Sequence, residues 1–185
     1  SPYWAIMYDY YGGVYMPIMS SQEALDTQYP MQTLEEKGVN VAFHSDYVVT
    51  EPDIGWLYYA ALTRTLPQKV YDMWYEGVEE YYYRDTDPEA SHDIEDYDED
   101  VMPILTLEDY DQRLDFEQTL EASTINGAKS MGLADEIGSI ETGKMADIII
   151  LNMDIRNAVE KSLDDLETVA PVLTIASGEV VYEEA

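Results

Sequence analysis

An aspartate at position 46 could act as a general base or as a metal ligand. It follows an apolar segment, Val39–Phe43, whose residues are typical of a strand buried on both faces. Such strands belong to parallel sheets covered by helices, and in barrels of alternating strands and helices their carboxyl ends carry the active site. His44, Ser45 and Asp46 would lie at that end. A carboxylate there can accept a proton from water, although an ordinary solvent-exposed loop aspartate is the alternative.

Other residues could contribute to a substrate pocket around Asp46. His44 could line the pocket or hydrogen-bond a substrate; a packed histidine is an equal alternative, and we do not expect it to bind a metal. Tyr47 could form a wall of the pocket. In the aromatic N-terminal segment, Trp4 could belong to a short strand or to the lip of a pocket.

The elements on either side of Val39–Phe43 have to position these side chains. Tyr29–Gly38 predicts a short helix that a glycine ends directly before the strand. Thr50–Trp56 predicts a loop that turns into a helix reaching Arg64, with Pro52 in its first turn. A helix followed directly by a buried strand is the order found in α/β barrels.

The second half of the chain predicts two further helical regions. Thr106–Asp109 has the residues of a helix cap, and Phe116–Gly132 predicts one helix, bent near Asn126-Gly127 and ended by a glycine. Asn152–Glu167 is polar and predicts a helical or irregular stretch.

Strands dominate the prediction for the C-terminal region. Ile137–Asp147 predicts two turns around a short strand, and Ile148–Leu151 a buried strand. Val172–Tyr182 predicts two strands hinged at Ser177-Gly178. We expect these strands to form an all-β layer that does not continue a barrel.

The charge of the chain limits its partners. Its 185 residues include 9 basic and 39 acidic side chains, a formal net charge of −30 at pH 7. This charge argues against nucleic acids and anionic membranes as partners, and it is familiar from proteins adapted to high salt. Neither a membrane-spanning apolar run nor a basic leader is seen, so we expect a soluble, cytoplasmic protein.

The counts of cysteine and histidine limit the possible metal sites. The chain has no cysteine, which excludes disulfides and thiolate ligands, and it has two histidines, His44 and His92. A zinc site built on three histidines therefore cannot come from this chain alone.

The aromatic and acidic composition of residues 65–105 predicts an insertion. The spacing of Asp85, Asp87 and Glu89 resembles the start of a calcium-binding loop. Its sixth position is Ala90 where a glycine is needed, and its twelfth is Asp96 in place of glutamate. We therefore predict a solvated insertion without a specific cation site, and we assign no role to its histidine.

Four motifs occur in an order that resembles the C-terminal part of the amidohydrolase superfamily. They are Gly38–Asp46, Ala122–Ala128, Gly138–Ile148 and Thr174–Tyr182. The chain is most similar to amidohydrolase family 3, which includes N-substituted formamide deformylases; the sequence GSIETGKMADIIIL is the most diagnostic motif. The resemblance implies an α/β fold comprising the C-terminal portion of a TIM-like (β/α)8 barrel and part of a small β-sandwich. Residues 1–136 would belong to the barrel and residues 137–185 to the sandwich.

The resemblance also assigns roles to particular residues. Trp4–Met7 would lie near the end of the seventh barrel strand, and Val39–Phe43 would be the eighth. Asp46 would match the catalytic aspartate that binds a divalent metal, usually zinc, and takes a proton from the attacking water. The family's other ligands, on its first, fourth, fifth and sixth strands, have no counterpart in this sequence. Lys144 and Asp147 would form packing contacts and hydrogen bonds in a structural turn.

Two functions stay open at this point. The first is a metal-dependent hydrolase that cleaves a non-peptide carbon–nitrogen bond of a small molecule. The rest of its barrel would be disordered, cleaved away or supplied by another polypeptide, and the 185 residues alone would be inactive. The second is a non-catalytic remnant that folds by association with another chain, with Asp46 as a structural acid. In both cases we expect a homo-oligomer or association with the missing barrel part, because open strand edges and apolar surface need a partner.

Overall fold

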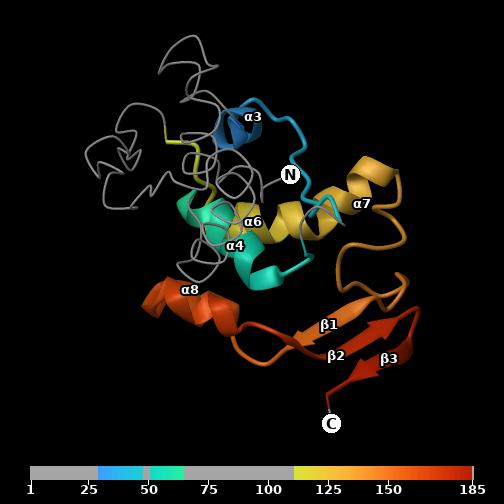
Figure 1. Cartoon of the computed structure of the whole chain (residues 1–185). Helices are drawn as coiled ribbons and strands as arrows, with labels where there is room; N and C mark the ends of the chain where they lie inside the picture. Colours follow the sequence, from blue (N-terminus) through green and yellow to red (C-terminus); the bar gives the residue numbers. More distant parts are fainter. Residues whose placement is uncertain (1–28, 48–50, 65–110, 185) are drawn as a thin grey trace, which may run out of the picture.

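The computed structural model of the chain describes residues 29–47, 51–64 and 111–184 (Figure 1). These residues form a mixed α/β structure, in which helices pack together and a small antiparallel sheet lies at the end of the molecule that carries the C-terminus. The predictions for Trp4, Thr106–Asp109 and residues 65–105, including His92, fall outside the described ranges. Within those ranges, no helix is long and apolar enough to cross a membrane.

Helices α3 (Met31–Glu36) and α4 (Ile54–Thr63) confirm the two helices predicted around residues 39–47. Gly38 ends the first with a φ of 72°, a left-handed conformation that glycine adopts at little cost. Asp53 caps the second, because its carboxylate accepts a hydrogen bond from the Trp56 backbone N–H at 2.8 Å. Pro52 thus precedes the cap instead of lying in the first turn as predicted.

The helix predicted for Phe116–Gly132 is divided into α6 (Phe116–Ser123) and α7 (Ile125–Met131). The break is at Thr124, two residues before the predicted bend, where φ is −131° and ψ is −96°. The Thr124 hydroxyl donates a hydrogen bond to the Leu120 carbonyl at 2.6 Å, a bond that competes with regular helix geometry. The predicted end at Gly132 is confirmed, with φ of 73°.

Strands β1 (Ile148–Leu151), β2 (Pro171–Ala176) and β3 (Glu179–Glu183) form the antiparallel sheet in the order β1-β2-β3. The predicted hinge is confirmed: Ser177 and Gly178 both have positive φ, which a two-residue hairpin turn of the favoured hand requires. The prediction that the first strand is buried is wrong, because Ile149 and Ile150 are 53% and 49% exposed. The sheet is therefore uncovered there in the part of the chain that the structure describes.

Helix α8 (Ile155–Lys161) and the 3-10 helix η4 (Leu163–Thr168) connect β1 to β2 and join the sheet to the other helices. Among the described residues, one core lies between α4, α8 and η4, and its central side chains are Tyr58, Ala158, Leu166 and Val169. Leu166 is fully buried. Arg156 connects α8 to α6, because its guanidinium lies 4.3 Å from the centre of the Phe116 ring.

Burial raises the pKa of the Tyr58 hydroxyl above its ordinary value of 10.0. The Tyr58 hydroxyl ionises at a lower pH in the unfolded chain than in the folded one. The stability that the neutral Tyr58 hydroxyl contributes is therefore complete below about pH 10 and is lost as the pH rises through the folded-state pKa. We expect the stability difference between the native protein and Tyr58→Phe to change above pH 10 and to stay constant between pH 7 and 9. Urea unfolding at several pH values measures it, and a constant difference at all pH values would contradict the expectation.

Candidate functional site

The segment that carries Asp46 is extended but is not a strand. The prediction of a buried strand at Val39–Phe43 is therefore wrong for this structure, and Val39 is 47% exposed. A strand exists only where a neighbouring strand supplies hydrogen-bond partners, and the segment bonds to helices instead. The Phe43 N–H donates to the Ala122 carbonyl at 2.9 Å, and the Val39 N–H to the Leu34 carbonyl at 3.0 Å.

The structure places three of the four predicted site residues next to each other on an exposed turn. His44 and Asp46 are exposed, and the Tyr47 side chain is 68% exposed. Asp46 has a φ of 59°, a left-handed conformation in which aspartate is one of the more tolerated non-glycine residues. The fourth, Trp4, lies outside the described ranges. The turn presents a carboxylate and an imidazole to solvent, and these groups can exchange protons with a bound molecule.

The described residues do not make a metal centre by themselves. In residues 29–47, 51–64 and 111–184, no three histidine, aspartate or glutamate side chains come together as ligands. A metal with protein ligands usually needs at least three of them. Asp46 therefore fits the role of one ligand at most, and the described residues cannot supply the full ligand set of the ion that the family resemblance implies.

Two asparagines that sequence reasoning missed hold the Asp46 segment. The Asn126 side chain is buried and donates to the Val41 carbonyl at 3.1 Å. The Asn40 side-chain amide donates to the Asn126 carbonyl at 3.0 Å and to the Ser130 hydroxyl at 2.9 Å. A polar residue of low helix propensity at a core-facing helical position was the available signal for Asn126.

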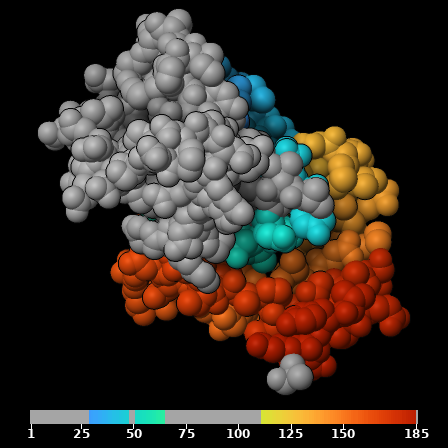
Figure 2. Space-filling view, viewed as in Figure 1, coloured from blue at the N-terminus to red at the C-terminus, as the bar shows by residue number. Residues whose placement is uncertain are grey.

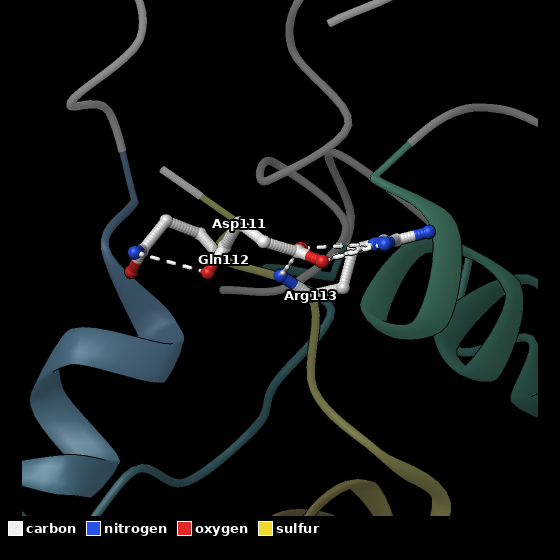
Figure 3. A network of polar contacts seen from close by, with 3 residues as sticks. All are labelled: Asp111, Gln112 and Arg113. Carbon is white, nitrogen blue, oxygen red and sulfur yellow. Dashed lines mark hydrogen bonds and ion pairs between the residues drawn. The ribbon is translucent and has the colours of Figure 1, made fainter. Parts of the chain in front are cut away.

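A second polar network lies beside this segment and is structural (Figure 3). The Arg113 guanidinium donates to Asp111 at 2.9 Å and lowers the pKa of that carboxyl. Between them, Gln112 is buried, and its side-chain oxygen accepts from the Thr33 backbone N–H at 3.0 Å. The Leu114 N–H donates to the Ala61 carbonyl at 3.0 Å. Residues 111–114 thus hold α3 and α4 together.

The diagnostic motif forms the predicted hydrogen-bonded turns, but the short strand predicted within Ile137–Asp147 is wrong, because no residue of 137–147 pairs as a strand and β1 begins at Ile148. The Lys144 ammonium donates to the Ser139 hydroxyl at 2.6 Å and pairs with Glu141 at 3.0 Å. The Asp147 carboxylate accepts from the Ser177 backbone N–H at 2.7 Å. This last bond connects the residue before β1 with the turn between β2 and β3, so Asp147 fixes the hairpin relative to the first strand.

Replacing Asp147 by alanine is expected to lower the free energy of unfolding by about 1–2 kcal/mol, because a charge-assisted hydrogen bond across the sheet is lost. Asp147→Asn is the matched control: its amide oxygen still accepts the bond, and we expect a loss of about 0.5 kcal/mol or less. Chemical denaturation measures both. Equal losses in the two variants would show that the hydrogen bond at Ser177 is not the cause.

Comparison with known proteins identifies the family. The model of the amidohydrolase family, in its family 3 form, matches residues 4–182. The chain therefore belongs to the amidohydrolase family.

Individual relatives match shorter segments. An imidazolonepropionase of Bacteroides thetaiotaomicron is 52% identical over 42 residues, which are 23% of this chain and 10% of that protein. An S-triazine hydrolase of Gordonia rubripertincta is 50% identical over 50 residues, 27% of this chain and 10% of the relative. Escherichia coli guanine deaminase is similar in structure over 44% of this chain and 22% of that chain, with 28% identity and a TM-score of 0.33. The matched segments thus span a small part of each relative's length.

Proposed function

We propose that this chain is the C-terminal part of a hydrolase that cleaves a non-peptide carbon–nitrogen bond in a small molecule. The match to the amidohydrolase family over residues 4–182 is the observation that carries the proposal. The names of two relatives support the substrate class, since S-triazine and imidazolone are nitrogen-rich ring compounds. In this proposal residues 1–136 belong to a TIM-like barrel and residues 137–185 to a β-sandwich.

Asp46 is the proposed general base. Its carboxylate accepts a proton as the oxygen of a water molecule bonds to the substrate carbon, and it returns that proton to the nitrogen as the carbon–nitrogen bond breaks. His44 and Tyr47 lie on the same turn and are proposed to contact the substrate. A divalent ion, zinc according to the family resemblance, would need most of its ligands from outside the described residues.

Exposed apolar side chains on the sheet support association with the missing barrel part or with a second copy. Val180, Val181 and Tyr182 of β3 are 57%, 61% and 47% exposed, and Ile149 and Ile150 of β1 are about equally exposed. Figure 2 shows this sheet, coloured orange to red, at the surface of the molecule. An exposed apolar strand at a sheet edge favours pairing with another strand.

The complete gene product that contains this sequence tests the proposed function. Its intact mass and zinc content are measured, followed by release of ammonia from an amino-substituted S-triazine and of formate from N-benzylformamide. A mass well above 21.1 kDa, bound zinc and turnover of one probe are the expected results. A mass near 21.1 kDa without metal or turnover would contradict the proposal and favour the non-catalytic remnant.

A further inference from the structure

We propose that Asn126 is a positioning residue that fixes the direction of the segment carrying Asp46; the inference rests on the proposed role of Asp46 as the base. In the part of the chain that the structure describes, residues 39–46 pair with no strand. After the Val39 bond to the Leu34 carbonyl, their path is set by hydrogen bonds to α6 and α7, and Asn126 makes two of these bonds.

The orientation of the Asn126 side chain is determined by its surroundings. The Lys129 ammonium donates to its side-chain oxygen at 2.8 Å, so the amide nitrogen has to face the Val41 carbonyl. The Asn126 carbonyl accepts from the Asn40 amide, and the Ser130 hydroxyl donates to the same carbonyl at 3.0 Å. Because the side chain is 4% exposed, water does not readily replace these bonds.

These bonds fix the backbone shortly before the turn that carries Asp46. The Asn126 bond acts at Val41, and the backbone bond to Ala122 acts at Phe43, three residues before Asp46. The chain then turns at Asp46 itself, where φ is 59°. Two fixed points on the backbone restrict the direction in which the chain enters this turn. Loss of one of them widens the range of positions of the carboxylate, and a misplaced catalytic group lowers kcat strongly.

Asn126→Asp is the decisive variant. Aspartate has nearly the same shape and keeps the contact with Lys129, but it cannot donate to the Val41 carbonyl. Asn40→Ala is the second variant; its side chain is exposed, so the substitution leaves the core intact while removing the bonds to Asn126 and Ser130. Asn152→Asp is the matched control, since its amide donates to the Thr168 carbonyl at 2.8 Å, far from Asp46 in the sequence.

Two readouts on the complete gene product test the proposal: hydrogen exchange of backbone amides, and kcat and KM with the probe that the native protein converts. In Asn126→Asp we expect the Phe43 amide, which donates to the Ala122 carbonyl, to exchange about tenfold faster while the amides of α4 are unchanged, and kcat to fall about tenfold with KM within twofold. Asn40→Ala is expected to show the same pattern more weakly. Asn152→Asp is expected to change neither readout at this segment.

Other outcomes overturn the inference. Native kcat in Asn126→Asp does so, whether or not the segment exchanges faster. Faster exchange throughout the protein in both Asn126→Asp and Asn40→Ala also does so, because the role would then be structural only. Failure of the proposed function is distinguished by Asp46→Asn: if that variant is fully active, Asp46 is not the base, whatever Asn126 does. If Asp46→Asn is inactive and Asn126→Asp is fully active, the positioning role alone is wrong.

Discussion

Replacing Asp46 by asparagine is expected to lower the kcat of the complete gene product by about 10²- to 10⁴-fold, the usual contribution of a general base. An amide cannot accept the proton of the attacking water, so the step proposed for this residue is lost. Asparagine suits the test because it has the same shape and also tolerates the left-handed conformation seen at this position, where φ is 59°. A loss of activity can then be attributed to the chemistry of the carboxylate and not to backbone strain.

Glu51→Gln is the control for the Asp46 variant. It removes one exposed carboxylate close by in the sequence and lowers the net negative charge by the same amount. We expect its kcat and KM to be within twofold of the native values. If Asp46→Asn were as active as Glu51→Gln in steady-state assays, Asp46 would not be the base, and its place on an exposed turn would be that of an ordinary loop acid.

Replacing Gly55 by alanine is expected to lower the free energy of unfolding by about 1–3 kcal/mol, the usual cost of overpacking. Gly55 lies in the first turn of α4, where the helix meets η4. A Cβ atom at this position would lie 1.9 Å from the Leu166 carbonyl oxygen. Because that oxygen belongs to the backbone, α4 and η4 would have to move apart, and the core around Leu166 and Tyr58 would open.

Gly127→Ala is the matched control, because this glycine is also helical and a Cβ atom there would meet nothing within 4 Å. It lies inside α7, where alanine is favoured over glycine by about 0.5–1 kcal/mol, so we expect a small gain in stability. Urea or thermal unfolding compares the two variants. An equal effect of both substitutions would show that the close approach of α4 and η4 is not what makes Gly55 necessary.

The sequence by itself determined the elements whose signals are local. The glycines at 38 and 132 end helices because they adopt positive φ without a steric penalty, and this property does not depend on distant residues. The Ser177-Gly178 turn is set in the same way by two adjacent residues. The motif at 138–151 identified the amidohydrolase family, and its turn forms the hydrogen bonds expected for Lys144 and Asp147. The division at residues 136 and 137 stays a prediction.

Only the tertiary structure decided the features that depend on residues far apart in the sequence. The composition of Val39–Phe43 suits a strand, but a strand forms only beside another strand, and this segment bonds instead to Leu34, Ala122 and Asn126. The Asn126 contact with Val41 joins residues 85 positions apart, and no local pattern encodes such a pair. Apolar composition alone likewise cannot show whether a second layer covers the isoleucines of β1. Whether a side chain is buried and whether a strand is paired depend on neighbours in space, and those neighbours are set only when the whole chain has packed.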